Sequence, residues 1–307
     1  MIVGITGANG FIGRELVALL RDRHVEVLPI QRRASPSGDA LVIGDLRAGT
    51  LPANLQERAD VVVHLASAGS GGNSDWADPN DPLVADLVAG CRTAMHLAHA
   101  LGAKHFIFVS SIKALAEDSG EGVLTEDAVP APSTSYGLGK LLAEKHVRAS
   151  AAGLGMRWTI VRPPMVHGTG YRGNFGLMVR LARSGMPLPL GGIGNLRSMV
   201  SVRNLCDALA AMAGNPAAAG QVFHIVDGPP ISTSEMLRVL AEAQGRTVHL
   251  FSVPGPLARA AGRLPVVGGL VRRLTGNLAV AGNLVREELG WNPPLAGLRA
   301  LRQSVRG

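Results

Sequence analysis

The segment that decides the fold reads Thr6-Gly7-Ala8-Asn9-Gly10-Phe11-Ile12-Gly13. It lies between a β-branched run at residues 2–6 and a stretch whose apolar residues recur at helical spacing. Glycines at such a strand-to-helix turn let backbone N–H groups and a helix N-terminus approach a pyrophosphate. The spacing Gly-x-x-Gly-x-x-Gly differs from the more common Gly-x-Gly-x-x-Gly, so the place of the turn carries as much weight as its glycines.

Strands and helices are expected to alternate along the first half of the chain. Apolar runs predict strands near residues 25–30, 41–43, 61–65 and 106–109, and a helix is expected near 83–101. Continuous apolar runs suit strands that are buried on both faces. The sequence therefore predicts an α/β protein with a doubly wound parallel sheet of the Rossmann type and a smaller α/β lobe that binds substrate.

The pattern changes after residue 161, where Gly- and Pro-rich turns enclose a short helical stretch. We expect a dinucleotide-binding domain over residues 1–165, to which residues 195–226 return, and a substrate-binding lobe over residues 166–194 and 227–307. Within that lobe, residues 254–276 mix four arginines with apolar residues. Packing inside the lobe is favoured because Gly and Pro interrupt this stretch, and a weak membrane-surface contact is the alternative.

Composition excludes several classes of protein. The chain has 307 residues, 47% of them hydrophobic and 17% charged, which is enough apolar material for a large core and excludes extensive disorder. The net charge of +7 favours anionic partners without naming their class. No basic run is interleaved with aromatic residues, so we expect no binding to nucleic acid.

The two cysteines, Cys91 and Cys206, are too few for a disulfide framework and lack the spacing of a zinc site. We interpret both as buried thiols in a reducing compartment and expect no bound metal. The sequence opens without a charged leader, and no apolar run reaches the roughly 18 residues that cross a bilayer. A cytoplasmic protein is therefore expected.

The second and third strands end on residues that suggest the choice of cofactor. Gln31-Arg32-Arg33 stands where a carboxylate commonly binds the ribose of NAD, and guanidinium groups bind phosphate well. NADP is therefore expected in preference to NAD, with solvated surface arginines as the alternative. Asp45, before Leu46, could accept a hydrogen bond from the adenine amino group or could instead cap its own loop.

Tyr136 and Lys140 are four residues apart at the start of a helical pattern, so their side chains share one face. Ser111 ends the strand before them. A tyrosine has a pKa of about 10, and we expect the neighbouring ammonium and a cationic nicotinamide ring to lower it. Ser111 would hold a substrate oxygen while Tyr136 transfers the proton and the cofactor moves hydride.

These residues, in this order, resemble the extended short-chain dehydrogenase/reductase family of the NAD-dependent epimerase/dehydratase type. The resemblance covers nearly the whole chain and implies hydride transfer at a sugar carbon by Ser111, Tyr136 and Lys140. The contacts that it implies for the cofactor involve Gly7, Asn9, Gly10, Phe11, Ile12, Gly13, Arg32, Arg33, Asp45, Leu46, Leu65, Ala66, Ser67, Tyr136, Lys140 and Pro163.

The second half of the chain resembles one subgroup of that family. Residues 173–175, 187–191 and 195–200 look like those of the UDP-N-acetylhexosamine 4-epimerases and the 4-keto reductases that form UDP-N-acetylquinovosamine. The resemblance implies substrate contacts from Ser111, Asn174, Pro189, Leu190 and Arg197. The closing segment at residues 289–294 looks like a packing motif with Trp291 in the core.

The sequence is compatible with three functions. The leading hypothesis is an NADP-dependent reductase or dehydrogenase at carbon 4 of a nucleotide sugar, expected to be UDP-linked, as in polysaccharide biosynthesis, because Arg32 and Arg33 suit NADP. The alternative is a 4-epimerase that keeps NAD bound and shows no net redox change. A non-catalytic dinucleotide sensor is the alternative of another class, and retention of Ser111, Tyr136 and Lys140 opposes it. A homodimer is expected in each case.

Overall fold

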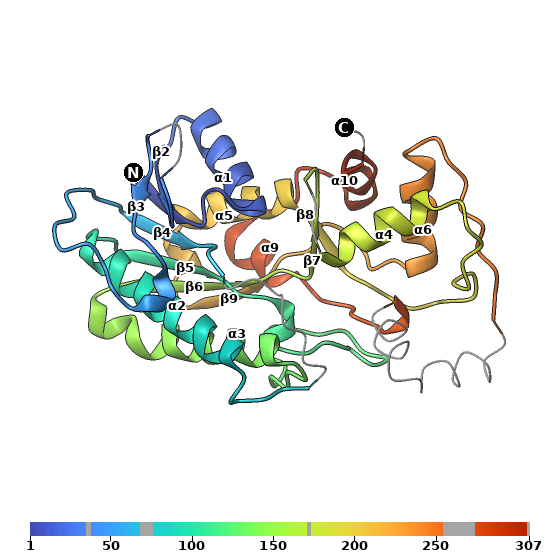
Figure 1. The fold of residues 1–307 in the computed structure, drawn as a ribbon, viewed down its shortest axis with the longest axis horizontal. Helices are drawn as coiled ribbons and strands as arrows, with labels where there is room; N and C mark the ends of the chain where they lie inside the picture. The colour runs from blue at the N-terminus through green and yellow to red at the C-terminus, as the bar shows by residue number, and fades with distance from the viewer. Residues whose placement is uncertain (35–37, 68–75, 171–172, 254–273, 306–307) are drawn as a thin grey trace.

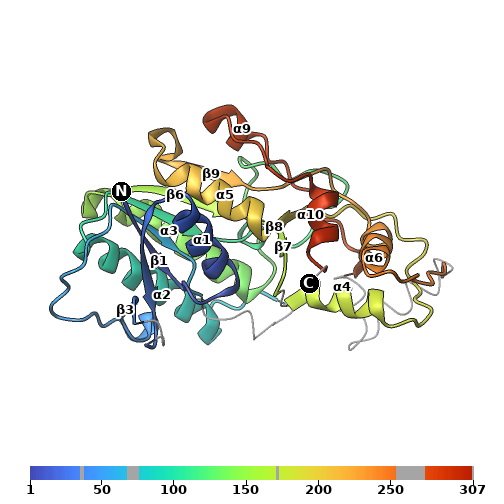
Figure 2. The same cartoon turned by 90° about the horizontal axis from the view of Figure 1, so that it is seen from above.

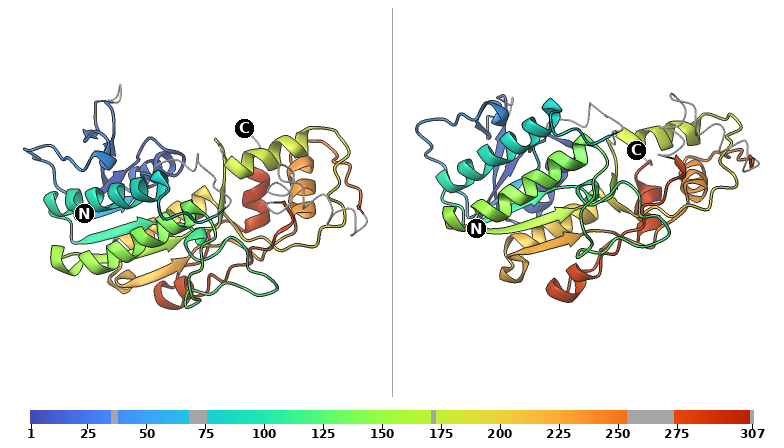
Figure 3. Two further views of the ribbon diagram at one scale, coloured as in Figure 1. Left: turned by 60° about the horizontal axis from the view of Figure 1, so that its bottom comes forward. Right: turned by 90° about the horizontal axis from the view of Figure 1, so that it is seen from below.

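The computed structural model describes residues 1–34, 38–67, 76–170, 173–253 and 274–305. Two lobes lie side by side, and one contains a large sheet covered by helices (Figure 1). The other contains the helices α4 (Gly173–Arg183), α6 (Thr233–Glu242) and α10 (Gly297–Gln303). The N-terminus lies in the sheet lobe and the C-terminus in the smaller lobe, as the further views in Figure 3 also show.

The large sheet has seven strands in the order β3-β2-β1-β4-β5-β6-β9. Every neighbouring pair in it is parallel. The strands are β1 (Ile2–Thr6), β2 (Glu26–Gln31), β3 (Leu41–Val42), β4 (Val61–His64), β5 (His105–Val109), β6 (Arg157–Arg162) and β9 (Gln221–His224). The strand order reverses between β1 and β4, where open sheets of this kind bind their ligands. The predicted doubly wound fold is confirmed.

Helices cover both faces of the sheet (Figure 2). Helices α1 (Phe11–Asp22) and α5 (Val202–Ala213) pack on one face, and α2 (Pro82–Ala100) and α3 (Ser135–Ser150) pack on the other. Strand β4 shows why its run is continuously apolar: Val61 and Val63 face the first pair of helices, whereas Val62 faces the second. Alternate side chains of one strand are thus buried in different cores.

The smaller lobe has its own core and its own short sheet. Strands β7 (Met165–His167) and β8 (Met199–Ser201) form a parallel pair. Helices α4, α6 and α10 share a core that includes Phe175, Val179, Leu237, Leu240 and Leu301. Because β9 follows α5 and returns to the large sheet, the chain passes between the lobes more than once. The residue boundaries of the two domains stay a prediction.

Short helices complete the described part of the chain. They are η1 (Leu46–Ala48), η2 (Ile112–Ala114), η3 (Ala152–Leu154), η4 (Pro216–Ala218) and α9 (Leu284–Leu289). Within the described ranges, no helix combines the length and the apolar character that crossing a bilayer would need. Most of the arginine-containing segment at 254–276, on which the membrane-surface alternative depends, lies outside the described residues.

Trp291 fixes the closing segment to the sheet lobe. Its side chain is 7% exposed and packs in the core under α1 and α5. Its indole Nε1 donates a 2.7 Å hydrogen bond to Asp207 in α5, and the same carboxylate pairs with Arg23 at the end of α1. The predicted core position of Trp291 is confirmed, and one buried aromatic side chain joins the chain end to two helices.

We expect Trp291→Ala to lower the free energy of unfolding by about 3–5 kcal/mol, because it leaves a cavity and removes the partner of Asp207. Urea denaturation followed by circular dichroism measures this change. Trp76, whose side chain is 68% exposed, is the matched control. Its replacement by Ala should change stability by about 0.5 kcal/mol or less. Equal losses in the two variants would contradict the role given to Trp291.

Candidate active site

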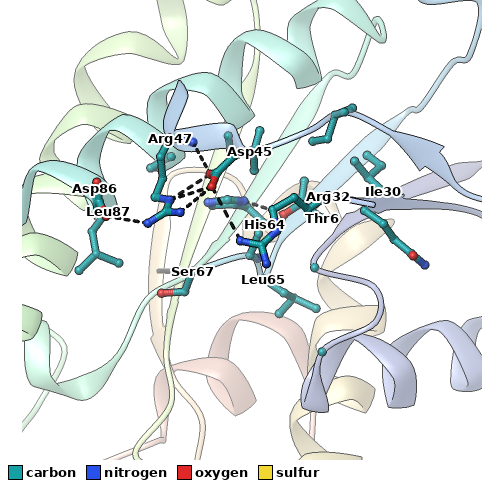
Figure 4. Close-up of a pocket in the computed structure, with 18 of the residues that line it drawn as sticks. Thr6, Ile30, Arg32, Asp45, Arg47, His64, Leu65, Ser67, Asp86 and Leu87 are labelled. Atoms are coloured by element: carbon teal, nitrogen blue, oxygen red, sulfur yellow. Dashed lines mark hydrogen bonds and ion pairs between the residues drawn. The ribbon is translucent and has the colours of Figure 1, made fainter. Parts of the chain in front are cut away.

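A cavity of about 640 Å³ opens at the carboxyl ends of the central strands, where the strand order reverses. Figure 4 shows side chains that line it. The predicted cofactor residues among its lining are Gly7, Asn9, Gly10, Arg32, Asp45, Leu46, Leu65, Ala66, Ser67 and Lys140. Within the described chain, the other predicted cofactor residues, Phe11, Ile12, Gly13, Arg33, Tyr136 and Pro163, are not part of this lining. Their contacts with a cofactor stay a prediction.

The glycine turn allows the backbone to pack tightly at one wall of the cavity. Gly7 has a φ of 72°, and a Cβ atom there would lie 2.8 Å from the backbone nitrogen of Ala66. A Cβ atom at Gly13 would lie 2.2 Å from the carbonyl oxygen of Gly7. Helix α1, described in full, has no side-chain cap and no acidic residue in its first turn. Its positive end is therefore suited to an anion such as a pyrophosphate.

Charged side chains gather at the end of the cavity near β2 and β3 (Figure 4). Arg47 donates to Asp45 through Nη2 at 2.6 Å and to Asp86 of α2 through Nη1 at 2.9 Å. The hydrogen bond from the Arg47 side chain lowers the pKa of Asp45 to about 2. Asp45 also accepts from the backbone N–H of Arg47, so it caps its own loop, one of the two predicted roles.

Arg32 lies at this same end of the cavity. Its Nη1 is 3.8 Å from Asp45 Oδ2, and its side chain is largely exposed. Sequence reasoning missed two lining residues here, Arg47 and Asp86. Arg47 could have been found from its place two residues after Asp45, because a short Asp-x-Arg spacing favours a local ion pair. Asp86 carried no such signal, since it comes from a distant helix.

Lys140 is buried at the other end of the cavity. Its Nζ donates a 3.1 Å hydrogen bond to the carbonyl oxygen of Val109 and lies 4.9 Å from the centre of the Phe108 ring. Burial lowers the pKa of Lys140 to about 8, and the charge of Glu144 opposes that shift. Lys140 is therefore the buried cation of this end of the cavity at neutral pH.

His64 lines the cavity beside Lys140. Its ring stacks on Phe108, with the ring centroids 5.8 Å apart. Its Nδ1 lies 2.7 Å from Thr6 Oγ1. Burial, followed by the charge of Lys140, lowers the pKa of His64 to about 3. This histidine is consequently neutral at physiological pH and adds no charge to the site.

Tyr136 and Ser111 lie close to Lys140. Tyr136 is in the first turn of α3, where Thr134 caps the helix by accepting from the N–H of Gly137. The Tyr136 ring centre is 6.0 Å from Lys140 Nζ. Ser111 caps η2 and accepts from the N–H of Lys113 at 3.2 Å. The structure thus brings the three predicted catalytic side chains together around the end of β5.

The expected lowering of the Tyr136 pKa is not found in the protein alone. Burial raises the pKa of Tyr136 to about 12, and a hydrogen bond with Ser111 opposes this only in part. The Lys140 ammonium is 6.0 Å from the ring centre and donates to the Val109 carbonyl. In the chain by itself burial therefore decides the pKa of Tyr136, and the lowering expected when a cationic nicotinamide ring is also present stays a prediction.

The predicted substrate residues of the second lobe have different surroundings. Arg197 is half-buried, and its Nη1 donates to the carbonyl oxygen of Gly276 at 2.9 Å. Burial lowers the pKa of Arg197, and the charge of Asp118 opposes this. Pro189 is exposed, whereas the Leu190 side chain packs in the lobe core. The Asn174 side chain lies outside the described residues.

A parallel sheet with a glycine turn before its first helix and a cavity at its switch point defines a dinucleotide-binding α/β protein. The chain belongs to the NAD dependent epimerase/dehydratase family, whose profile matches residues 3–226. The family predicted from the motifs is confirmed, whereas the subgroup stays a prediction.

Relatives of known name extend this similarity over most of the chain. A "UDP-glucose 4-epimerase" of Vibrio cholerae is 36% identical over 98% of this chain and 94% of its own length. An "N-acetyl-alpha-D-glucosaminyl-diphospho-ditrans,octacis-undecaprenol 4-epimerase" of Escherichia coli is 24% identical over 84% of this chain and 77% of its own length. The Thermus thermophilus UDP-glucose 4-epimerase in complex with NAD superposes with a TM-score of 0.76, at 21% identity over 100% of this chain and 98% of that one.

Both cysteines are buried free thiols, as predicted. Burial raises the pKa of Cys91 to about 12, although Lys140 opposes the shift, and burial raises the pKa of Cys206 as well. We expect neither thiol of the native protein to react readily with Ellman's reagent at pH 8, because the thiolate is the reactive form. Both should react after unfolding in guanidinium chloride. One thiol reacting in the native protein as fast as free cysteine would contradict this result.

Proposed function

We propose that this protein is an NAD(P)-dependent enzyme that acts at carbon 4 of a UDP-linked hexose or N-acetylhexosamine, with Ser111, Tyr136 and Lys140 as its catalytic residues. The observation that carries the proposal is the meeting of these three side chains at the end of β5, with Lys140 lining the cavity at the switch point. The similarity to a UDP-glucose 4-epimerase over nearly the whole chain supports the substrate class.

The cavity suits a dinucleotide. The close backbone approach at Gly7 and Gly13 leaves room for a pyrophosphate beside the positive end of α1. Arg32 and Asp45 lie at one end of the cavity, where the adenosine would bind, and Lys140 lies at the other end. When bound, the nicotinamide of such a cofactor accepts or donates hydride at a substrate carbon.

The chain's own residues would manage the proton and the orientation of the substrate. Ser111 Oγ would hold the substrate oxygen, and Tyr136 Oη would take or give its proton. Because burial raises the pKa of Tyr136 to about 12, ionisation of this group needs positive charge close by. Lys140 places a positive charge 6.0 Å from the centre of the ring, and its own lowered pKa makes that charge sensitive to pH.

A 4-epimerase is the form of this activity that the two sequence relatives described above favour, since both are named 4-epimerases. This reverses the order expected from the sequence, in which a reductase led. Arg32 is the observation that supports a 4-keto reductase as second candidate, because a cation at the adenosine end of the cavity suits the 2′-phosphate of NADP. The proposed NADP preference rests on this residue.

One assay separates the two candidates. An epimerase should interconvert UDP-glucose with UDP-galactose, or their N-acetylated forms, without net change in nicotinamide absorbance. A reductase should instead oxidise NADPH in the presence of a UDP-4-keto-6-deoxy-N-acetylhexosamine. Binding of the dinucleotide with neither reaction would favour the non-catalytic sensor.

Whichever reaction is found, we expect Tyr136→Phe to reduce kcat by about 10²–10⁴-fold, because the variant has no proton to transfer. Lys140→Met should also reduce kcat strongly. Lys145→Met is the matched control, since Lys145 lies on the same helix and is exposed. Full activity of Tyr136→Phe would reject the proposed mechanism for both candidates.

For the cofactor, we expect Arg32→Ala to weaken NADP binding by about tenfold or more and NAD binding much less, because only NADP carries the 2′-phosphate. Isothermal titration calorimetry with each dinucleotide measures both affinities. Arg33→Ala is the control, and it should have the smaller effect because Arg33 does not line the cavity in the described structure. Equal losses for NAD and NADP in Arg32→Ala would remove the basis for the NADP preference.

A further inference from the structure

A fully buried ion pair lies beneath the candidate active site. Glu144 of α3 and Arg162 at the end of β6 have side chains that are 1% and 2% exposed. Arg162 donates through Nε to Glu144 Oε1 at 3.0 Å and through Nη2 to Oε2 at 2.6 Å. Ser110 Oγ donates a third hydrogen bond to Oε1 at 2.6 Å. The Glu144 carboxylate therefore accepts three hydrogen bonds, two from the last residue of β6 and one from the residue that follows β5.

Each member of this cluster adjoins a residue of the candidate site. Ser110 immediately precedes Ser111 in the chain, and Arg162 immediately precedes Pro163. The backbone at this junction is also tied, because Ser110 N donates to Val161 O at 2.8 Å. The cluster thus joins the ends of β5 and β6 at the residues that precede Ser111 and Pro163, which are predicted contact residues.

Glu144 lies one helical turn after Lys140, so both side chains are on the same face of α3. Besides the Val109 carbonyl, the groups that face Lys140 are His64 of β4, Cys91 of α2, and Tyr136 and Glu144 of α3 itself. Burial keeps His64, Cys91 and Tyr136 neutral near pH 7, because their pKa values are about 3, 12 and 12 in that order. Among these groups, Glu144 is the one that supplies negative charge.

Arg162 is the second charge of the cluster, and apart from Glu144 its neighbour in the adjacent strand adds no charge at neutral pH. Its neighbour in the sheet is His224, whose pKa burial lowers to about 4. A buried ion pair of this kind commonly adds little net stability over an apolar pair of similar size, because both charges lose their hydration. The pair is therefore expected to matter for the position and the charge of neighbouring side chains more than for stability.

We propose that Glu144, Arg162 and Ser110 form a positioning cluster that holds Lys140 and Ser111 in their relative places and gives the Lys140 ammonium its negative countercharge. The inference rests on the catalytic role proposed for Lys140. None of the three residues lines the cavity in the described structure, so they act through their neighbours and are not catalytic residues themselves.

The two charges of the pair should shift the titration of Lys140 in opposite directions. Glu144→Gln removes a negative neighbour and leaves Arg162 unpaired, so the pKa of Lys140 should fall below its value of about 8. Arg162→Met leaves the carboxylate without its partner, so the pKa should rise. In the double variant both charges are absent, so the pKa should lie between the values of the two single variants.

Lysine NMR measures these values without turnover. Lys104, Lys113, Lys140 and Lys145 are the lysines of the chain, so selective labelling gives few signals, and Lys140→Met assigns the one of interest. The exposed Lys104 and Lys145 serve as internal controls whose titration should not change. We expect shifts of about one pH unit or more, of opposite sign, in the two single variants. Shifts of the same sign, or none, would overturn the countercharge role.

Kinetics test the positioning role. The double variant should fold, because no unpaired charge is buried, yet its kcat should fall about tenfold or more with little change in KM, since Lys140 and Ser111 lose their support. Full kcat in the double variant would overturn the positioning role. If Glu144→Gln does not fold, Arg162→Met and the double variant still decide the test. The variants could shift the Lys140 pKa as expected while the protein turns over no nucleotide sugar. That result would refute the proposed function and leave the charge coupling intact.

Discussion

The close contact between the glycine turn and the end of β4 is the constraint on which the cavity depends. Gly7 lies so near the backbone of Ala66, and Gly13 so near the carbonyl of Gly7, that neither position accommodates a Cβ atom without movement. This contact lets α1 begin at the carboxyl edge of the sheet with its positive end toward the cavity. Larger residues would push the helix away and separate the strand ends from it.

The two ends of the cavity use charge differently. At the end near β2 and β3, the ion pairs that join Arg32, Asp45, Arg47 and Asp86 are partly exposed, and pairs of this kind contribute little stability and rearrange easily. At the other end, Lys140 and the pair behind it are buried, so their positions and charges are held by packing. A ligand can therefore reorganise the first end, whereas the second end is organised before a ligand arrives.

Local sequence patterns were sufficient for much of the fold and for part of the site. The glycine turn, the apolar strands and the helical spacing of Tyr136 and Lys140 are short-range features, and the structure places them as expected. Arg47 and Asp86 were missed because their contact joins η1 to a helix 39 residues away. The raised pKa of Tyr136 was missed because burial depends on the packing of the whole lobe.

The sequence by itself determined the parallel α/β fold, the glycine turn and the family, because all three depend on residues that are neighbours in the chain or one helical turn apart. Only the tertiary structure decided which serine of the Ser110-Ser111 pair points to the buried carboxylate and which remains beside Tyr136. It likewise decided that Glu144 meets Arg162, since residues of a helix and a strand become partners only when the sheet assembles. Burial then set the charge of each group, which no spacing along the chain encodes.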